Sequence, residues 1–159
     1  MKIKVVAIGK IKESYWKEAL EEYSKRLSGY CTLEIFEPDD EKAPADCSDK
    51  EALQIKEKEG RKLLSKIKPS EYVVALDLNA NAYDSPQLAA RLEEWFVQGN
   101  STVTFLIGGS LGLSDEVKKK ANERWTLSRL TFTHQMTRVI LLEQIYRAFK
   151  INRHETYHK

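Results

Sequence analysis

The stretch TVTFLIGGSLGL, residues 102–113, decides the fold class because an apolar strand runs directly into a glycine-rich turn. The apolar part, Thr102–Ile107, is typical of a strand that is covered on both faces. Residues 2–8 and 72–78 have the same character. Such strands alternate with helical patterns along the chain. This arrangement predicts the α/β class, a mainly parallel sheet with helices on both faces.

The segments between these strands carry helix signals. Apolar residues recur at spacings of three and four from Tyr15 to Leu27. Ser48 and Glu51 predict a capping box, Ser85 with Pro86 predicts another helix start, and Ser114 can cap a short basic helix. In order, the expected elements are strand 2–8, helix 15–27, strand 32–36, loop 37–46, helix 48–67, strand 72–78, helix 85–98, strand 102–107, helix 115–122, a short strand at 125–127 and helix 134–150.

Length and composition narrow the class of protein. A chain of 159 residues, 42% of them apolar, fits one domain, since domains commonly run to about 100–200 residues. No transmembrane span and no signal peptide is expected, so a cytoplasmic location follows by elimination. The only two cysteines, Cys31 and Cys47, form neither a disulfide framework nor a metal-binding pair. We interpret Cys31 as a packing residue and expect no metal site.

Charge is unevenly distributed although the net charge is only +2. Residues 118–159 hold ten Lys and Arg against three Asp and Glu, and the rest of the chain is acidic. The asymmetry is consistent with an anionic partner for the C-terminal part, and equally with a solvated charged surface. The small total argues against binding nucleic acid by electrostatics alone.

The turn Gly108–Leu113 is the first candidate for chemistry. Ligands of parallel α/β sheets bind beyond the carboxyl ends of strands, and glycine lets backbone N–H groups approach them closely. The pattern GGSLG is neither a P-loop nor a dinucleotide-binding fingerprint, which argues against ATP and NAD. A purely structural turn explains it about as well.

The C-terminal part holds two more candidates. All three histidines, His134, His154 and His158, lie in the last 26 residues, where they are either proton-transfer groups or surface residues. Tyr157 beside His158 could stack on a nucleobase. The last expected helix has a broad apolar face, which is either core or the contact to a second subunit, and Arg138 and Arg147 lie near its margins.

Over essentially its whole length, the chain resembles the RlmH family of ribosomal RNA large-subunit methyltransferases, which belong to the SPOUT class. The resemblance rests on long, specific stretches. They are MKIKVVAIGKIKESYWKEALEEYSKRL at 1–27, DEKAP at 40–44, EKEGRKLLSKI at 57–67, VVALDL at 73–78, FLIGGSLGLS at 105–114, LSRLTFTHQMTRVILLEQIYRAFKI at 127–151 and the closing YHK.

This resemblance implies a deep trefoil knot in the C-terminal part whose loops bind S-adenosylmethionine. The implied reaction is methylation of N3 of a pseudouridine in 23S ribosomal RNA, within the assembled ribosome. The implied protein is a homodimer in which the tail of one subunit completes the site of the other; neither DNA nor a membrane is an expected partner. Carried over by position, the cofactor-binding residues are Leu76, Gly108, Leu127, Ser128, Arg129, Leu130, Thr131 and Phe132.

The chemistry of that reaction suggests roles for three further residues. N3 of pseudouridine is a weak nucleophile while it is protonated, so its proton must be removed or the anion stabilised. We assign His158 as the base and Tyr157 as the group that stacks on or orients the ring. Arg138 is expected to stabilise charge on a uracil carbonyl or to hold a phosphate.

The chain departs from the usual family pattern at four positions. Ala80 and Asn81 stand where a glycine and a basic residue are common, and Thr133 and Thr156 each replace a proline. The last change removes a fixed φ before Tyr157. Two other functions remain as alternatives, a non-catalytic ribosome-binding factor with the same fold and a transfer RNA methyltransferase. The intact glycine turn disfavours the first, and the lack of an added RNA-binding domain disfavours the second.

Overall fold

A computed structural model covers residues 1–159 and contains one five-stranded sheet in which every pairing is parallel. The strand order is β2-β1-β4-β3-β5. The strands are β1 (Lys2–Ala7), β2 (Thr32–Phe36), β3 (Tyr72–Leu76), β4 (Thr102–Ile107) and β5 (Glu123–Trp125). The expected α/β class is therefore confirmed.

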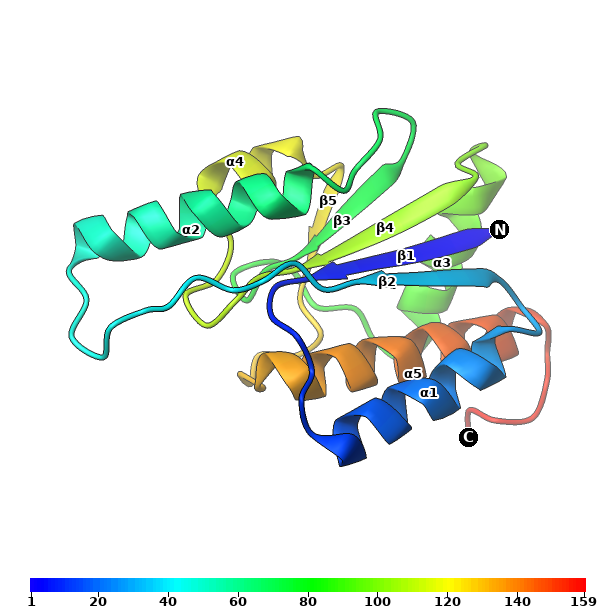
Figure 1. The fold of residues 1–159 in the computed structure, drawn as a ribbon. Coiled ribbons are helices and arrows are strands. Elements are labelled where there is room, and N and C mark those ends of the chain that lie inside the picture. Colours follow the sequence, from blue (N-terminus) through cyan, green and yellow to red (C-terminus); the bar gives the residue numbers. More distant parts are fainter.

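Helices cover both faces of this sheet (Figure 1). One face carries α1 (Ser14–Leu27), α3 (Ser85–Val97) and α5 (His134–Asn152), and the other carries α2 (Asp49–Leu64) and α4 (Asp115–Lys120). All five strands run in the same direction, so the loops after β3, β4 and β5 emerge at one edge of the sheet. The N-terminal end of α5 lies at that edge too (Figure 1).

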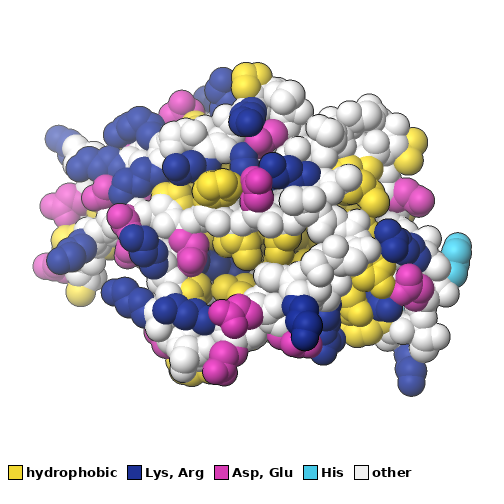
Figure 2. All heavy atoms as spheres, turned by 45° about the vertical axis from the view of Figure 1, so that its right-hand side comes forward, with side chains coloured by type: hydrophobic (Ala, Val, Ile, Leu, Met, Phe, Trp, Pro, Cys, Tyr) yellow, Lys and Arg dark blue, Asp and Glu magenta, His cyan; other side chains and the backbone are white.

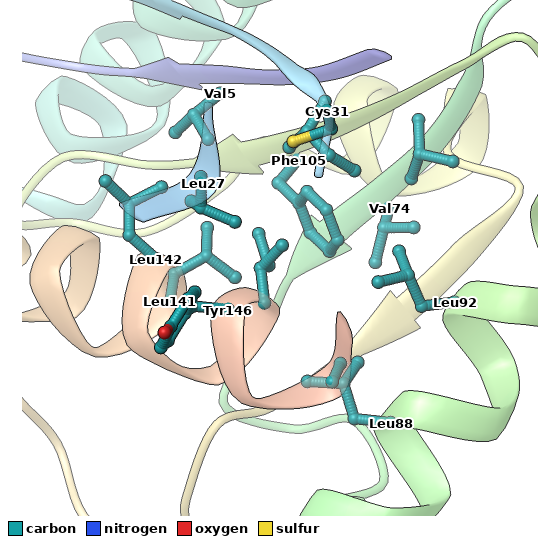
Figure 3. Close-up of a cluster of buried hydrophobic side chains, with 14 of the residues drawn as sticks. Val5, Leu27, Cys31, Val74, Leu88, Leu92, Phe105, Leu141, Leu142 and Tyr146 are labelled. Atoms are coloured by element: carbon teal, nitrogen blue, oxygen red, sulfur yellow. The ribbon is translucent and has the colours of Figure 1, made fainter. Parts of the chain in front are cut away.

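The larger core lies between the sheet and α1, α3 and α5. Figure 3 shows side chains such as Phe105 from β4, Leu92 from α3 and Leu141 from α5 pointing towards one another. Cys31 lies at the margin of this cluster as a free thiol, and burial raises its pKa to about 11. A thiol that stays protonated at neutral pH is unreactive. The interpretation of Cys31 as a packing residue is confirmed.

A smaller core on the other face brings α2 and α4 together. Leu63 of α2 and Val117 of α4 are fully buried against strand side chains such as Leu106. The two helices approach closely at Gly60, where an added Cβ would lie 2.4 Å from Oγ of Ser114. This contact fixes α4, and with it the far end of the glycine turn, against α2.

Most element boundaries follow the local signals. Ser48 and Glu51 form the predicted capping box, and Ser114 caps α4. The predicted cap of α3 was wrong by one residue. The carboxylate of Asp84, rather than Ser85, accepts from the backbone N–H of Gln87, and the side-chain oxygen of Gln87 accepts from the backbone N–H of Asp84. Asp84, immediately before Ser85 and Pro86, therefore forms the capping box of α3. The last strand is Glu123–Trp125 rather than 125–127, because Glu123 and Trp125 pair with Val74 and Leu76.

The last helix begins after Thr133, one of the departures from the family pattern. Its hydroxyl accepts a hydrogen bond from the backbone N–H of Met136, so this threonine is an ordinary N-cap. None of the helices is both long enough and apolar enough to pass through a membrane. The trefoil knot stays a prediction.

Candidate cofactor site

A pocket of about 740 Å³ opens at the carboxyl edge of the sheet. Its walls are the loop after β3, the glycine turn after β4, the segment between β5 and α5, and the first turn of α5. Lys56 of α2 and Lys118 of α4 complete the rim. The lining residues are 76–79, 107–113, 126–128, 130–135 and 137, with the two lysines. A concave site at this edge is where open α/β sheets bind ligands.

The pocket brings together most of the residues that the family resemblance implies. Of the eight predicted cofactor-binding residues, all except Arg129 line it. The segments that supply them are far apart in sequence, and parallel pairing of β3 with both β4 and β5 places them side by side.

The backbone of the pocket is rich in unpaired hydrogen-bond donors. The N–H groups without an acceptor in the protein include those of Gly108, Ser110, Leu111, Ser128, Arg129, Thr131 and Phe132. Both segments also contribute carbonyl oxygens. Free backbone N–H groups suit a ligand that accepts several hydrogen bonds, such as an adenine ring or an amino acid carboxylate. The carbonyl oxygens can in turn accept from the adenine amino group.

Glycine is required by the shape of the turn after β4. An added Cβ at Gly108 would lie 2.9 Å from the backbone carbon and oxygen of Gly112. Gly112 itself has φ +88°, a conformation that other residues rarely adopt. The turn therefore folds back on itself, which keeps side chains out of this wall of the pocket.

One charged group at the pocket, Asp77, was not singled out from the sequence. Asp77 follows β3 directly and is buried, with Arg124 at 3.4 Å and Lys118 at 3.9 Å. Asp77 could have been identified from the sequence by its position directly after a buried strand, because ligands bind beyond the carboxyl ends of parallel strands. His134 lines the pocket at the start of α5, and burial together with the charge of Arg138 lowers its pKa. His134 is therefore neutral at neutral pH.

Arg138 does not reach this pocket. Its guanidinium, 1% exposed, donates to the backbone oxygens of Ile8 and Gly9, each at 2.7 Å, and to the carboxylate of Glu37. Burial lowers its pKa, and Glu37 acts in the opposite direction. The structure gives Arg138 an anchoring position between α5 and the end of β1, in place of the open position expected for a group that meets substrate.

Tyr157 and His158 lie apart from the pocket. The Tyr157 hydroxyl donates to Glu143 at 3.1 Å, and the Tyr157 ring centroid lies 4.6 Å from the guanidinium carbon of Arg147. Nη1 of Arg147 lies 3.3 Å from Nδ1 of His158. Burial and the charge of Glu143 raise the pKa of Tyr157 to about 12. Tyrosine therefore stays protonated, as a hydrogen-bond donor.

Distance along α5 separates the tail from the pocket within one protomer. Glu143 lies nine residues after His134, which is about 14 Å along a helix axis. Figure 1 shows the C-terminus below α1 and α5, away from the end where α5 begins. The implied base and the implied cofactor site are thus on different parts of one chain.

Comparison with known proteins defines the class. Residues 1–158 match the family described as Predicted SPOUT methyltransferase, and the chain belongs to this family. A solved structure of a probable methylase family protein from Haemophilus influenzae Rd KW20 has a similar fold, with TM-score 0.56 and 11% identity over 99% of this chain and 70% of that one.

Curated relatives define a narrower group. The chain is 55% identical to Ribosomal RNA large subunit methyltransferase H 1 of Clostridium perfringens (strain SM101 / Type A), over the full length of both chains. Ribosomal RNA large subunit methyltransferase H of Clostridioides difficile (strain 630) is also 55% identical, and that of Clostridium novyi (strain NT) is 52% identical, again over both full lengths.

Proposed function

We propose that this protein is an S-adenosylmethionine-dependent methyltransferase that methylates N3 of a pseudouridine in 23S ribosomal RNA within the ribosome. The observation that carries the proposal is the pocket at the carboxyl edge of the sheet, in a chain of the SPOUT family whose full-length relatives are named large-subunit ribosomal RNA methyltransferases. The residues present suit the cofactor, because the glycine turn after β4 and the segment between β5 and α5 offer unpaired backbone donors around a partly apolar pocket.

The cofactor site consists of backbone from two loops. Gly108 and residues 127–132 would hold S-adenosylmethionine, with Leu76 and Phe132 as apolar contacts. When bound, this cofactor supplies a methyl group that its sulfonium makes electrophilic. The protein must then orient the acceptor base and remove the proton from N3. In this proposal His158 accepts that proton and Tyr157 stacks on or orients the ring. Arg138 holds the start of α5 in place.

The separation of tail and pocket supports a homodimer with shared sites. On the face formed by α1 and α5, Tyr15 is 62% exposed and Met136 is 39% exposed, and Trp16, Tyr23 and Val139 are only partly covered. Apolar surface of this kind suits burial against a second copy. A dimer packed through these helices can bring the tail of one subunit to the pocket of the other.

Subunit complementation tests this arrangement. Thr131→Trp would fill the pocket from an exposed position, and deletion of residues 157–159 would remove the tail residues. We expect each variant alone to be inactive in a tritium-transfer assay on ribosomes, with co-expressed heterodimers regaining activity because one site has both parts. Mapping the methylated nucleotide then tests the pseudouridine assignment. Heterodimers without activity, alongside an active wild type, would contradict shared sites.

A further inference from the structure

Glu59 of α2 is a buried acid that the proposed reaction does not yet use. It is 4% exposed and lies directly behind the glycine turn. An added Cβ on Gly109 would lie 2.9 Å from both carboxylate oxygens of Glu59. Gly109 itself lines the pocket. Only the backbone of one glycine therefore separates this carboxylate from the proposed cofactor site.

No cation in the protein neutralises Glu59. No nitrogen of Lys, Arg or His lies within 4.0 Å of its carboxylate. Its one hydrogen bond comes from the backbone N–H of Glu41, at 3.1 Å. Lys62, whose charge acts on Glu59, pairs instead with Glu41 at 2.9 Å and with the backbone oxygen of Asp39.

The buried carboxylate of Asp77 and the partly buried carboxylates of this protein have cationic partners. Glu71 pairs with Lys4 at 2.7 Å, and Glu123 pairs with Arg91 at 2.5 Å. A buried charge without a partner is costly, so such groups usually have one. Burial raises the pKa of Glu59, the charges of Asp40 and Glu41 act in the same direction, and Lys62 opposes them. We therefore expect a ligand in the pocket to supply the positive charge that Glu59 lacks within the protein.

We propose that Glu59 is a specificity-determining residue whose carboxylate, beneath the glycine turn, favours a cationic sulfonium ligand over the neutral thioether that remains after transfer. This inference rests on the proposed function. S-adenosylmethionine and S-adenosylhomocysteine share their adenosine and amino acid parts and differ by the methyl group and one positive charge at sulfur. A fixed negative charge outside the binding contacts stabilises the donor and not the product, which favours product release.

Binding calorimetry with the full-length protein tests the proposal. We expect Glu59→Gln to lower the ratio of donor affinity to product affinity by about threefold to tenfold, as loss of one unit charge near the site implies. The affinity for S-adenosylhomocysteine should remain close to that of the wild type. Glu57→Gln removes an exposed carboxylate two residues away on the same helix and should leave the ratio unchanged.

The outcomes distinguish specificity from support of the turn. If Glu59→Gln weakens both ligands equally, or changes neither, the inference is wrong, because a supporting residue does not sense the charge at sulfur. Glu59→Asp keeps the charge and should retain the wild-type ratio. A wild-type protein that binds neither ligand would instead overturn the proposed function.

If Glu59→Gln does not fold, a measurement on the wild-type protein alone can test the inference. The affinity ratio should fall as the pH is lowered towards 5, since protonation removes the charge of Glu59. The charges that act on this carboxylate are Asp40 and Glu41, from the loop after β2, and Lys62, from α2. His134 also gains charge at the pocket, so the titration is repeated with His134→Asn. A ratio that is constant from pH 7.5 to 5 overturns the inference.

Discussion

The pocket loops and the C-terminal tail, the two regions that the proposed reaction requires, are held in different ways. The loops leave parallel strands directly, and Arg138 and the contact between Gly60 and Ser114 fix the elements beside them. Tyr157 and Glu155 contact the rest of the chain through hydrogen bonds to partly buried side chains, which include Glu143, Tyr30 and Lys150. The pocket is thus formed by loops that leave the sheet directly, whereas the tail lies on the protein surface.

This difference has a functional meaning. A cofactor needs a preformed site, and backbone held by a sheet provides one. In the proposed homodimer the tail reaches a neighbouring subunit and a nucleotide, and weak contacts that can be exchanged suit that role. Substitutions on the pocket side should therefore alter stability or cofactor binding, and substitutions in the tail should alter transfer alone.

Arg138→Ala should have the largest effect, on the pocket side. It leaves the carbonyl groups of Ile8 and Gly9 without their side-chain donor and Glu37 without its cationic partner. We therefore expect a loss of about 3–5 kcal/mol in the free energy of unfolding measured with urea. Arg147→Ala, which breaks a more exposed pair with Glu143, should cost less than about 1 kcal/mol. Equal losses would mean that both regions are held alike.

His158→Ala should separate the two regions most clearly. We expect methyl transfer to ribosomes to slow by about a hundredfold or more, the usual contribution of a general base, with stability and cofactor affinity unchanged. His154→Ala in the same tail is the matched control and should retain activity. Single-turnover assays and calorimetry provide the two readouts. Full activity of His158→Ala would remove it as the base.

Gly108→Ala should affect the pocket loops rather than the tail. Its methyl group would lie 2.9 Å from the backbone of Gly112, so the turn must shift, at a cost of about 1–3 kcal/mol. We expect cofactor affinity to fall by about tenfold or more, since 1.4 kcal/mol corresponds to tenfold. Gly29→Ala has open space around the new methyl group and should bind normally. Calorimetry that finds equal affinities would argue against a role for the turn.

Tyr157→Phe should have a smaller effect. It removes the hydroxyl that donates to Glu143 and keeps the ring. The tail therefore loses about 0.5–1.5 kcal/mol of the free energy that holds it against α5. We expect a slower transfer step and unchanged cofactor affinity. Tyr15→Phe, at an exposed tyrosine on α1, is the control. A loss of cofactor binding in Tyr157→Phe would show that the tail and the pocket are not independent.

Thr133→Ala should have the smallest effect, at the junction of the two regions. Loss of the cap on α5 should lower the free energy of unfolding by about 1 kcal/mol, measured by thermal denaturation. Thr137→Ala, one turn further along, removes only a bond to the backbone oxygen of Thr133 and should cost less. A larger loss in Thr137→Ala would contradict the assignment of Thr133 as the cap.

Local patterns in the chain were sufficient to predict the first four strands, most helix starts and the glycine turn. Hydrophobic periodicity and capping depend on residues within one or two turns, so they can be read from adjacent positions. Asp84 and Ser85 are neighbouring candidate caps, and Asp84 forms the capping box because Gln87 stands three residues after it.

Contacts between distant segments decided the rest. Arg138 looked like a substrate-binding group at the margin of a helix, and packing against the end of β1 made it an anchor. Glu59 looked like one acid of a charged helix, and the close approach of Gly109 placed it behind the pocket. Both outcomes depend on which faces meet across the sheet, a property of the assembled chain that periodicity within one element does not encode.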